Sequence, residues 1–147
     1  MKERIIKTKP HVVLLVLGDN DVGNKNPVDL CHDLLVTGVL IKEWMGEKVI
    51  QLGVFPCFWN PEHPYYKANY NMKAIQLNQY MCDNIDIEAG MHFWVCTRLA
   101  ITSHNVNKYI DKSHPITGGV HFNNAGYCIF HNEIRRALIT LLKIDHV

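Results

Sequence analysis

The sequence predicts an α/β domain in which helices cover both faces of a parallel sheet. The main observation is the order of elements: strand, helix, strand, helix, strand, loop and helix, with apolar runs alternating with helical periodicity. Such alternation is typical of parallel sheets with right-handed crossovers. The length of 147 residues suits one core, and we find no internal repeat, so residues 1–147 are expected to form a single domain.

The composition excludes several function classes. Fifteen basic and 14 acidic residues give a net charge of +1, with no basic block that would favour binding a nucleic acid backbone. The basic start of the chain, residues 2–9, is expected to be a solvated flank. No secretory signal and no membrane-spanning run is visible. Five cysteines without a CxxC pair suggest reduced core thiols, so we expect a cytoplasmic protein without a cofactor.

The first predicted strand organises the rest of the chain. Residues 11–17 form an unbroken apolar run, which predicts a fully buried strand, and residues 18–21 follow as a polar turn. Ligands of open α/β sheets bind outside the carboxyl ends of the strands. Asn20 and Asp21 therefore occupy a position where they could contact a ligand.

The first long helix is predicted from Pro27 to about residue 44. Asn26 can cap it and proline suits the first helical position. Gly38 is expected to be a weak point of this helix. The apolar positions at helical spacing predict a buried stripe of Val28, Cys31, Leu35 and Val39.

The remaining elements follow the same logic. Strands are predicted at residues 48–55 and 91–96, a helix at 66–85 and a short helix at 106–110. The last helix is capped by Asn123 or Asn124. The stripes expected to be buried are Tyr70, Ala74, Leu77, Met81 and Ile85 in the middle helix and Tyr127, Phe130, Ile134, Leu138 and Leu141 in the last.

Residues 56–64 form a stiff loop because three prolines remove hydrogen-bond donors and restrict the backbone. Phe58 and Trp59 lie in this loop. One interpretation makes them a wall of a substrate pocket. The other, slightly favoured, is an aromatic lid that packs on its own sheet.

Two motifs resemble those of the SGNH, or GDSL-type, hydrolases. Residues 18–21, Gly-Asp-Asn-Asp, match the G-x-N-D block, and residues 119–126 resemble the final D-G-x-H-L-N-x-x-G block, in the same order and separation. The resemblance implies a three-layer, flavodoxin-like fold. It covers about the C-terminal two thirds of such a domain, so we expect an N-terminal truncation. Esterase-like domains of animal retroelements are the most similar variety.

The resemblance also implies roles for individual residues. Asn20 would donate a hydrogen bond to the oxyanion, and His121 would act as the general base on a nucleophilic serine. The helix that begins after His121 disfavours the imidazolium and so favours a ring able to accept a proton. Asp21, Phe58 and Trp59 would line the site of a small acyl ester.

Two departures from the family pattern weaken the catalytic interpretation. The acid that should precede the histidine by three residues is replaced by Gly118, and Asp111 is the nearest upstream acid. The G-D-S block that carries the nucleophile is missing, because only ten residues precede the first strand and neither Ser103 nor Ser113 lies in a strand-to-helix elbow. We therefore expect a weakly active or inactive hydrolase-like domain with no nucleophile that can be named.

Alternative interpretations remain open. Taken singly, residues 18–21 are more often an Asx turn, and His121 a polar turn residue. The main rival is a non-catalytic binding or assembly module, a retroelement-derived scaffold that self-associates through the apolar edge strand 11–17. A metal-assisted hydrolase using His114, His121 and Asp21 ranks last, because the spacing matches no common zinc module.

Overall fold

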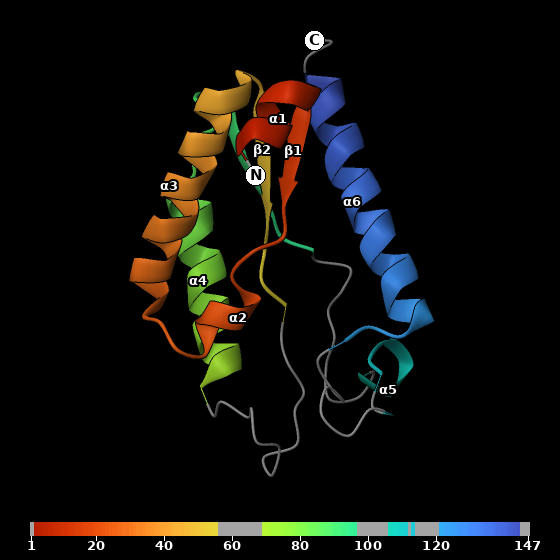
Figure 1. Ribbon diagram of the computed structural model, residues 1–147. Helices are drawn as coiled ribbons and strands as arrows, with labels where there is room; N and C mark the ends of the chain where they lie inside the picture. The colour runs from red at the N-terminus through yellow and green to blue at the C-terminus, as the bar shows by residue number, and fades with distance from the viewer. Residues whose placement is uncertain (1, 56–68, 97–105, 112, 114–120, 145–147) are drawn as a thin grey trace. The chain divides into compact units, whose positions relative to one another are not determined.

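The computed structural model describes residues 2–55, 69–96, 106–111, 113 and 121–144 (Figure 1). The chain divides into two compact units. The first comprises Met1–Phe55 and Asn69–Val95, and the second comprises Pro56–Ala68 and Cys96–Val147. The first unit contains the sheet and helices α1 to α4, whereas the second contains α5 and α6.

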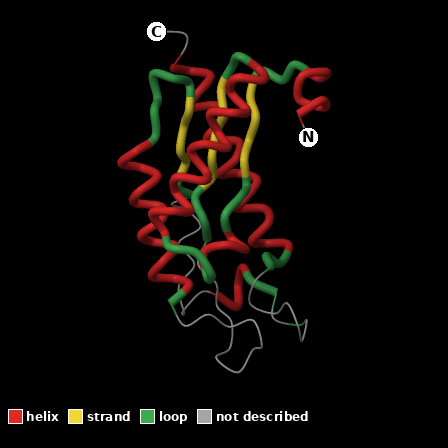
Figure 2. Tube along the Cα trace, turned by 60° about the vertical axis from the view of Figure 1, so that its left-hand side comes forward, coloured by secondary structure: helices red, strands yellow, loops and turns green. Residues whose placement is uncertain are grey.

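A parallel three-stranded sheet forms the centre of the first unit. Its strands are β1 (Val12–Leu15), β2 (Lys48–Leu52) and β3 (Met91–Trp94), in the order β1-β2-β3. Figure 2 shows the three strands side by side in yellow. The predicted α/β class with a parallel sheet is confirmed, and β1 is an edge strand of the sheet as described.

The first strand is shorter and less buried than predicted. Of β1 only Leu15 is buried, and Val16 and Leu17 lie beyond the strand with 47% and 43% of their surfaces exposed. The prediction of a fully buried strand over 11–17 was therefore wrong. An edge strand has a neighbour on one side only, and the chain leaves the sheet after Leu15.

Helix α3 (Pro27–Met45) begins as predicted, but its buried face is only partly the predicted one: Cys31 is buried and Leu35 is partly buried. The Asn26 side chain accepts a hydrogen bond from the Val28 amide at 2.9 Å, which confirms the cap. Val28 and Val39 are exposed, because α3 packs against both α4 and the sheet and these contacts determine which face is covered. The buried positions are Leu30, Cys31, Leu34, Gly38 and Ile41.

Gly38 is a close-packing position rather than a weak point. A Cβ atom there would overlap the terminal methyl group of Met91 on β3. The absent side chain therefore lets helix and sheet approach closely.

Helix α4 (Tyr70–Asn84) confirms most of its predicted stripe. Tyr70, Ala74, Leu77 and Met81 are all buried, whereas Ile85 follows the end of the helix. Residues 66–68, the predicted start, lie outside the described residues.

Two short helices were not predicted. Helix α1 (Lys2–Thr8) forms in the expected solvated flank, and its residues other than Ile5 are exposed, as predicted for the flank. Its Ile5 is partly buried against the cluster of Leu15, Ile41 and Val49. Helix α2 (Asp19–Val22) forms where the polar turn was expected.

The second unit contains α5 (Val106–Tyr109) and α6 (Asn124–Ile144), the short and the last predicted helices. An antiparallel bridge joins Ile110 to Phe122, and the Asn123 side chain accepts a hydrogen bond from the Gly126 amide at 3.0 Å, which confirms the cap. Tyr127 is 44% exposed, so its predicted burial was wrong; its ring packs edge-on against Phe122. In the helices as described, none is long and apolar enough to cross a bilayer.

Gly126 supports a prediction about stability. A Cβ atom at this position would overlap the carbonyl oxygen of Tyr109 and the Phe122 side chain. Alanine normally stabilises a helix by about 1 kcal/mol relative to glycine. Here we expect Gly126→Ala to lower the free energy of unfolding by about 1–3 kcal/mol, because overpacking outweighs helix propensity. Urea denaturation measures the change.

The neighbouring exposed Ala125 provides the matched control. Ala125→Gly should cost only the propensity difference of about 1 kcal/mol. A Gly126→Ala protein more stable than the parent would show that the close approach at Tyr109 is not a constraint.

Candidate functional site

Gly18 shapes the turn at the carboxyl end of β1. Its φ of 109° lies in the left-handed region that favours glycine. A Cβ atom there would lie 3.2 Å from Val54 Cγ2 and 3.5 Å from Leu34 Cδ1, so the site also has little space for a side chain. The carbonyl of Gly18 accepts hydrogen bonds from the amides of Asp21 and Val22, both at 3.0 Å. The G-x-N-D segment is therefore one turn of helix rather than an open turn.

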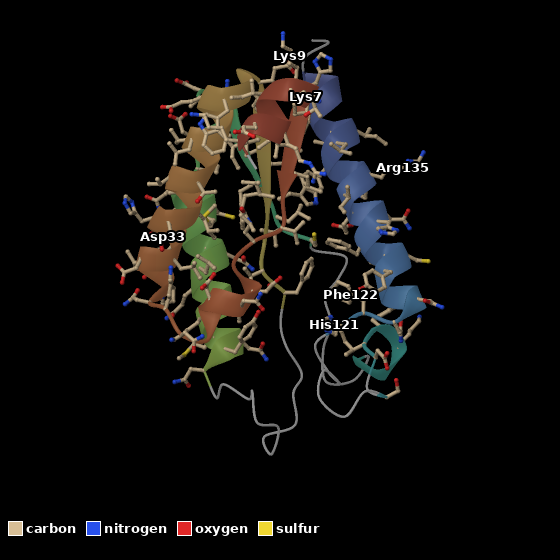
Figure 3. All side chains as sticks on the ribbon, in the orientation of Figure 1. Lys7, Lys9, Asp33, His121, Phe122 and Arg135 are labelled. Carbon is tan, nitrogen blue, oxygen red and sulfur yellow. The ribbon has the colours of Figure 1, made fainter. Side chains whose placement is uncertain are left out.

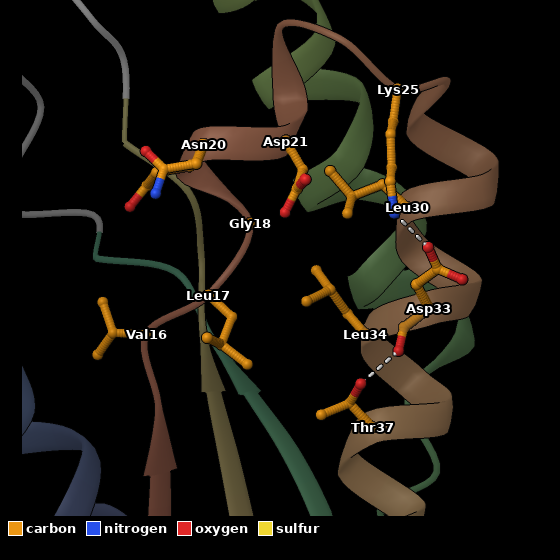
Figure 4. A pocket seen from close by; sticks show the side chains of 11 residues that line it. Val16, Leu17, Gly18, Asn20, Asp21, Lys25, Leu30, Asp33, Leu34 and Thr37 are labelled. Carbon is orange, nitrogen blue, oxygen red and sulfur yellow. Dashed lines mark hydrogen bonds and ion pairs between the residues drawn. The ribbon is translucent and has the colours of Figure 1, made fainter.

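A cavity of about 360 Å³ lies beside this turn (Figure 4). One part of its lining is apolar and comes from the two residues after β1 and from α3. The other part is polar and comes from α2, the loop that follows it and α3. The lining residues are Val16, Leu17, Gly18, Asp19, Asn20, Asp21, Lys25, Leu30, Asp33, Leu34 and Thr37.

The two site residues predicted on α2 face different ways. In Figure 4 the Asp21 carboxylate extends toward the space between Leu17 and Leu34. The Asn20 amide extends away from that space. Both residues are exposed to solvent. Asp21 thus contributes a negative charge directly to the cavity.

An ion pair joins the loop after α2 to α3. Lys25 Nζ lies 2.7 Å from the Asp33 carboxylate. This contact raises the pKa of Lys25 and lowers the pKa of Asp33. Lys73 Nζ donates to the carbonyl oxygen of Lys25 at 3.1 Å, so α4 also holds the loop. Lys25 and Asp33 line the cavity, and neither was predicted as a site residue.

The Asp19 carboxylate lies on the side of α2 that faces β2 and α4. It accepts hydrogen bonds from the Phe55 amide and the Tyr70 hydroxyl, both at 3.4 Å. Part of the residue is open to solvent, but neighbouring groups desolvate the carboxyl group and so raise the pKa of Asp19. The two hydrogen bonds oppose this rise. The charged form of Asp19 is therefore less favoured in the folded chain than in the unfolded one.

This pKa direction gives a prediction for pH dependence. An acid with a raised pKa in the folded state binds protons more tightly there, so folding is relatively less favoured once the pH exceeds that pKa. We expect Asp19→Asn to raise the free energy of unfolding at neutral pH. The gain should shrink as the pH falls through the raised pKa toward the ordinary value of 3.8. Denaturation at several pH values measures it, and a gain that grows on acidification would contradict the direction.

Two amide side chains, the buried Gln51 and the partly buried Asn78, hold the carboxyl ends of the strands. Gln51 Nε2 donates to the carbonyl oxygens of Leu17 at 3.2 Å and Leu52 at 2.7 Å. Asn78 Oδ1 accepts from the Val54 amide, and Asn78 Nδ2 donates to the Val54 carbonyl, both at 2.9 Å. Neither residue was predicted from the sequence. For Gln51 the available signal was a polar residue inside an apolar strand.

His121 lies in the second unit, at the start of the segment that leads into α6. Its carbonyl oxygen accepts a hydrogen bond from the Asp111 amide at 2.8 Å, and its side chain is exposed (Figure 3). The Asp111 carboxylate accepts instead from Ser113, from the amide at 2.8 Å and from Oγ at 2.6 Å. In the part of the chain described, no hydrogen bond orients the His121 ring.

Comparisons with known proteins identify the fold. No protein-family model and no curated protein matches the sequence. The chain is similar to the structure of a GDSL-like lipase from Bacteroides thetaiotaomicron, with a TM-score of 0.70 and 20% identity, over 95% of this chain and 67% of that one. The fold is that of a GDSL-type hydrolase. A candidate acylhydrolase from Bacteroides fragilis gives a TM-score of 0.71 at 20% identity, over 96% and 67% of the two chains.

The GDSL-type fold confirms the predicted fold resemblance. The Gly18–Asp21 block lies after β1, at the carboxyl edge of the parallel sheet. Asn20 belongs to the first unit and His121 to the second, so their convergence stays a prediction. Phe58, Trp59, Ser103, His114 and Gly118 lie outside the described residues. Over the described ranges, no three His, Cys, Asp or Glu side chains gather as metal ligands.

Proposed function

We propose that this chain is an acyl-ester hydrolase-like domain that is weakly active or inactive by itself. The observation that carries the proposal is the G-x-N-D turn beside a cavity of about 360 Å³, in a fold shared with a GDSL-like lipase. An asparagine amide is a suitable donor to the oxyanion of an ester's tetrahedral intermediate. We assign that role to Asn20, whose amide extends away from the cavity that Asp21 faces (Figure 4), so the ester carbonyl would lie outside the cavity and only the acyl chain within it. We assign the role of general base to His121.

The substrate-binding role falls to Asp21 and to the aromatic pair Phe58 and Trp59. A small acyl ester suits the mixed lining of the cavity, where apolar side chains can contact the acyl chain. We assign no residue of residues 1–147 as the nucleophile. Ser113 is bonded to Asp111, and we assign it no catalytic role. Asp111 is our candidate for the acid that the family places at the position of Gly118. Its carboxylate already accepts hydrogen bonds from Ser113.

The test adds a serine-bearing segment to the chain. The purified chain is assayed on a short-chain activated ester before and after a G-D-S segment, of the kind that the family resemblance implies, is fused to its N-terminus. We expect no labelling of the chain alone by a serine-directed phosphonate and measurable turnover by the fusion. In the fusion, Asn20→Ala should lower kcat by about 10²–10³-fold. His121→Ala should lower it by about 10⁴-fold or more.

Matched controls separate catalysis from folding. Asn24→Ala and His131→Ala change exposed residues of the same types in the same units, and they should leave turnover near the parent value. A folded fusion that is inactive, or whose activity ignores Asn20 and His121, would contradict the proposal. Phosphonate labelling of Ser103 or Ser113 in the unfused chain would also contradict it.

A second candidate function is a cytoplasmic binding or assembly module, a retroelement-derived scaffold that associates with itself through residues 11–17. The edge position of β1 favours it, because the free side of such a strand can pair with another chain. Light scattering tests this function separately from hydrolysis. A strictly monomeric chain with little aggregation would exclude self-association.

A further inference from the structure

The cavity beside the G-x-N-D turn has an apolar side. Leu30 and Leu34 of α3 line it and are 2% and 7% exposed, and Leu17 lies across the space from Leu34 (Figure 4). The volume of about 360 Å³ is at the small end of the range for sites that bind small molecules. A short alkyl chain is the group that this side of the cavity suits, because its burial removes apolar surface from water.

One carboxylate faces the same space without a hydrogen-bond partner. Asp21 extends its carboxylate into the cavity (Figure 4), and in the described part of the chain no group donates a hydrogen bond to it. The neighbouring Asp19 instead directs its carboxylate to the Phe55 amide and the Tyr70 hydroxyl. An ionised carboxylate only accepts hydrogen bonds, and its strongest partners are charged N–H donors.

The lysine that lines the cavity is already held by other contacts. Lys25 Nζ lies 2.7 Å from the Asp33 carboxylate. Lys73 Nζ of α4 fixes the loop itself, because it donates to the carbonyl oxygens of Gly23 at 3.4 Å and Lys25 at 3.1 Å. The charges of Lys25 and Asp33 cancel, so Asp21 leaves these three lining groups with an excess negative charge.

We propose that this cavity binds a short alkyl chain that ends in a primary ammonium group. The alkyl carbons contact Leu17, Leu30 and Leu34, and the ammonium donates to the Asp21 carboxylate. The inference rests on the proposed ester hydrolysis only in assigning this chain to the acyl group, whose carbonyl lies outside the cavity beside the Asn20 amide. The substrates are then short esters with an amine at the far end of the acyl chain.

Other classes of cation suit the lining less well. A quaternary ammonium group has no N–H to donate and is typically held by aromatic rings, whereas the described lining residues include no aromatic side chain. A divalent metal ion requires several oxygen, nitrogen or sulfur ligands, and over the ranges described no three such side chains gather. The combination of one free carboxylate with an apolar wall therefore favours an alkylammonium ion.

The binding test titrates the unfused chain with hexylammonium, hexanol and hexanoate, which carry similar alkyl chains and differ in charge. Methyl NMR signals of Leu17, Leu30 and Leu34 report occupancy of the cavity. We expect hexanol to bind about three- to fivefold more weakly than hexylammonium, and hexanoate more weakly still, because the ion pair with Asp21 is partly open to solvent. Butylammonium should bind about two- to fourfold more weakly for each methylene removed.

Asp21→Asn tests the carboxylate with little change in size. The Kd of hexylammonium should rise about three- to fivefold, to near that of hexanol, and the Kd of hexanol should not change. Asp29→Asn is the matched control. It removes an exposed acid in the first turn of α3 that does not line the cavity, so the preference for hexylammonium should persist.

Lys25→Met tests the charge balance in the opposite direction. It removes the positive charge that competes with the ligand and leaves the Asp33 carboxylate unpaired, so hexylammonium should bind about two- to fivefold more tightly. A purely structural role of Lys25 would not produce tighter binding. Lys7→Met, which changes an exposed lysine of α1, should have no effect.

Leu17→Ser tests the apolar side of the cavity. It should weaken hexylammonium and hexanol by the same factor, because both lose the same contact with the alkyl chain. Leu40→Ser is the matched control, since Leu17 and Leu40 are both 43% exposed and Leu40 does not line the cavity. Circular dichroism checks that each variant is folded.

Equal binding of hexylammonium and hexanol, or a preference that persists in Asp21→Asn, would overturn the inference. Methyl signals that do not respond to hexylammonium would overturn it too. The hydrolysis assay of the G-D-S fusion fails or succeeds separately. An active fusion whose cavity shows no amine preference leaves the proposed hydrolysis standing and removes the amine from its substrate. An amine preference in the unfused chain supports the site even where the fusion is inactive.

Discussion

Replacing Arg136 by methionine is expected to lower the free energy of unfolding by about 3–5 kcal/mol, because it leaves the Glu133 carboxylate buried without its charged partner. Glu133 has no exposed surface, and its Oε1 lies 2.6 Å from Arg136 Nη1. Its Oε2 has no hydrogen-bond partner among the groups that the structure describes. Methionine preserves much of the arginine's length and apolar contact. Urea denaturation measures the loss.

Arg135 provides the matched control on the same helix. It is exposed (Figure 3), so Arg135→Met should change stability by no more than about 0.5 kcal/mol. Replacing Glu133 and Arg136 together by methionine should recover most of the loss, because no buried charge then remains. Equal effects of the two single variants would show that the ion pair does not matter.

Glu133 also affects a second group in its unit. Burial and the negative charge of Glu133 together raise the pKa of Cys96 to about 12. A thiol with such a pKa stays protonated at neutral pH and is a poor nucleophile. This state agrees with the expectation that Cys96 is a reduced core thiol, because Cys96 is buried and forms no disulfide.

Local signals in the sequence predicted the start of α3 and the start of α6 correctly. A cap is a hydrogen bond between neighbours, such as that from Val28 to Asn26, so a few residues determine it. Burial depends on distant partners. The exposure of Val39 could not be predicted, because it depends on how α3 packs against α4. The exposure of Tyr127 likewise depends on a contact outside its helix, the edge-on packing of its ring against Phe122.

For the candidate site too, local signals could be predicted from the sequence and contacts with distant partners could not. Residues 18–21 could be located, because a glycine after an apolar strand is a local signal, and the structure places them beside the cavity. The hydrogen-bond partners of Gln51 and Asn78 could not be predicted, because they are brought together only once the strands and α4 are assembled. The ion pair of Lys25 with Asp33 likewise requires the loop to fold back on α3.

The second large effect is expected from Asn78→Ala. The Asn78 side chain satisfies both the amide and the carbonyl of Val54, and Val54 is only 6% exposed. An unsatisfied buried polar group costs about 1–3 kcal/mol, so losing both contacts should lower the free energy of unfolding by about 2–4 kcal/mol. Gln79→Ala is the control, because Gln79 pairs with Asp83 in an exposed contact and should contribute about 0.5 kcal/mol or less.

Asn78→Ala should also loosen the candidate site. Val54 Cγ2 would lie only 3.2 Å from a Cβ atom on Gly18, so the segment held by Asn78 forms one wall of the Gly18 turn. We therefore expect faster amide hydrogen exchange at Val54 and at Asp21 and Val22, whose amides bond to the Gly18 carbonyl. Exchange in α6 should change only through global unfolding. An increase that is uniform over both units would show that Asn78 stabilises the fold without specifically holding the site.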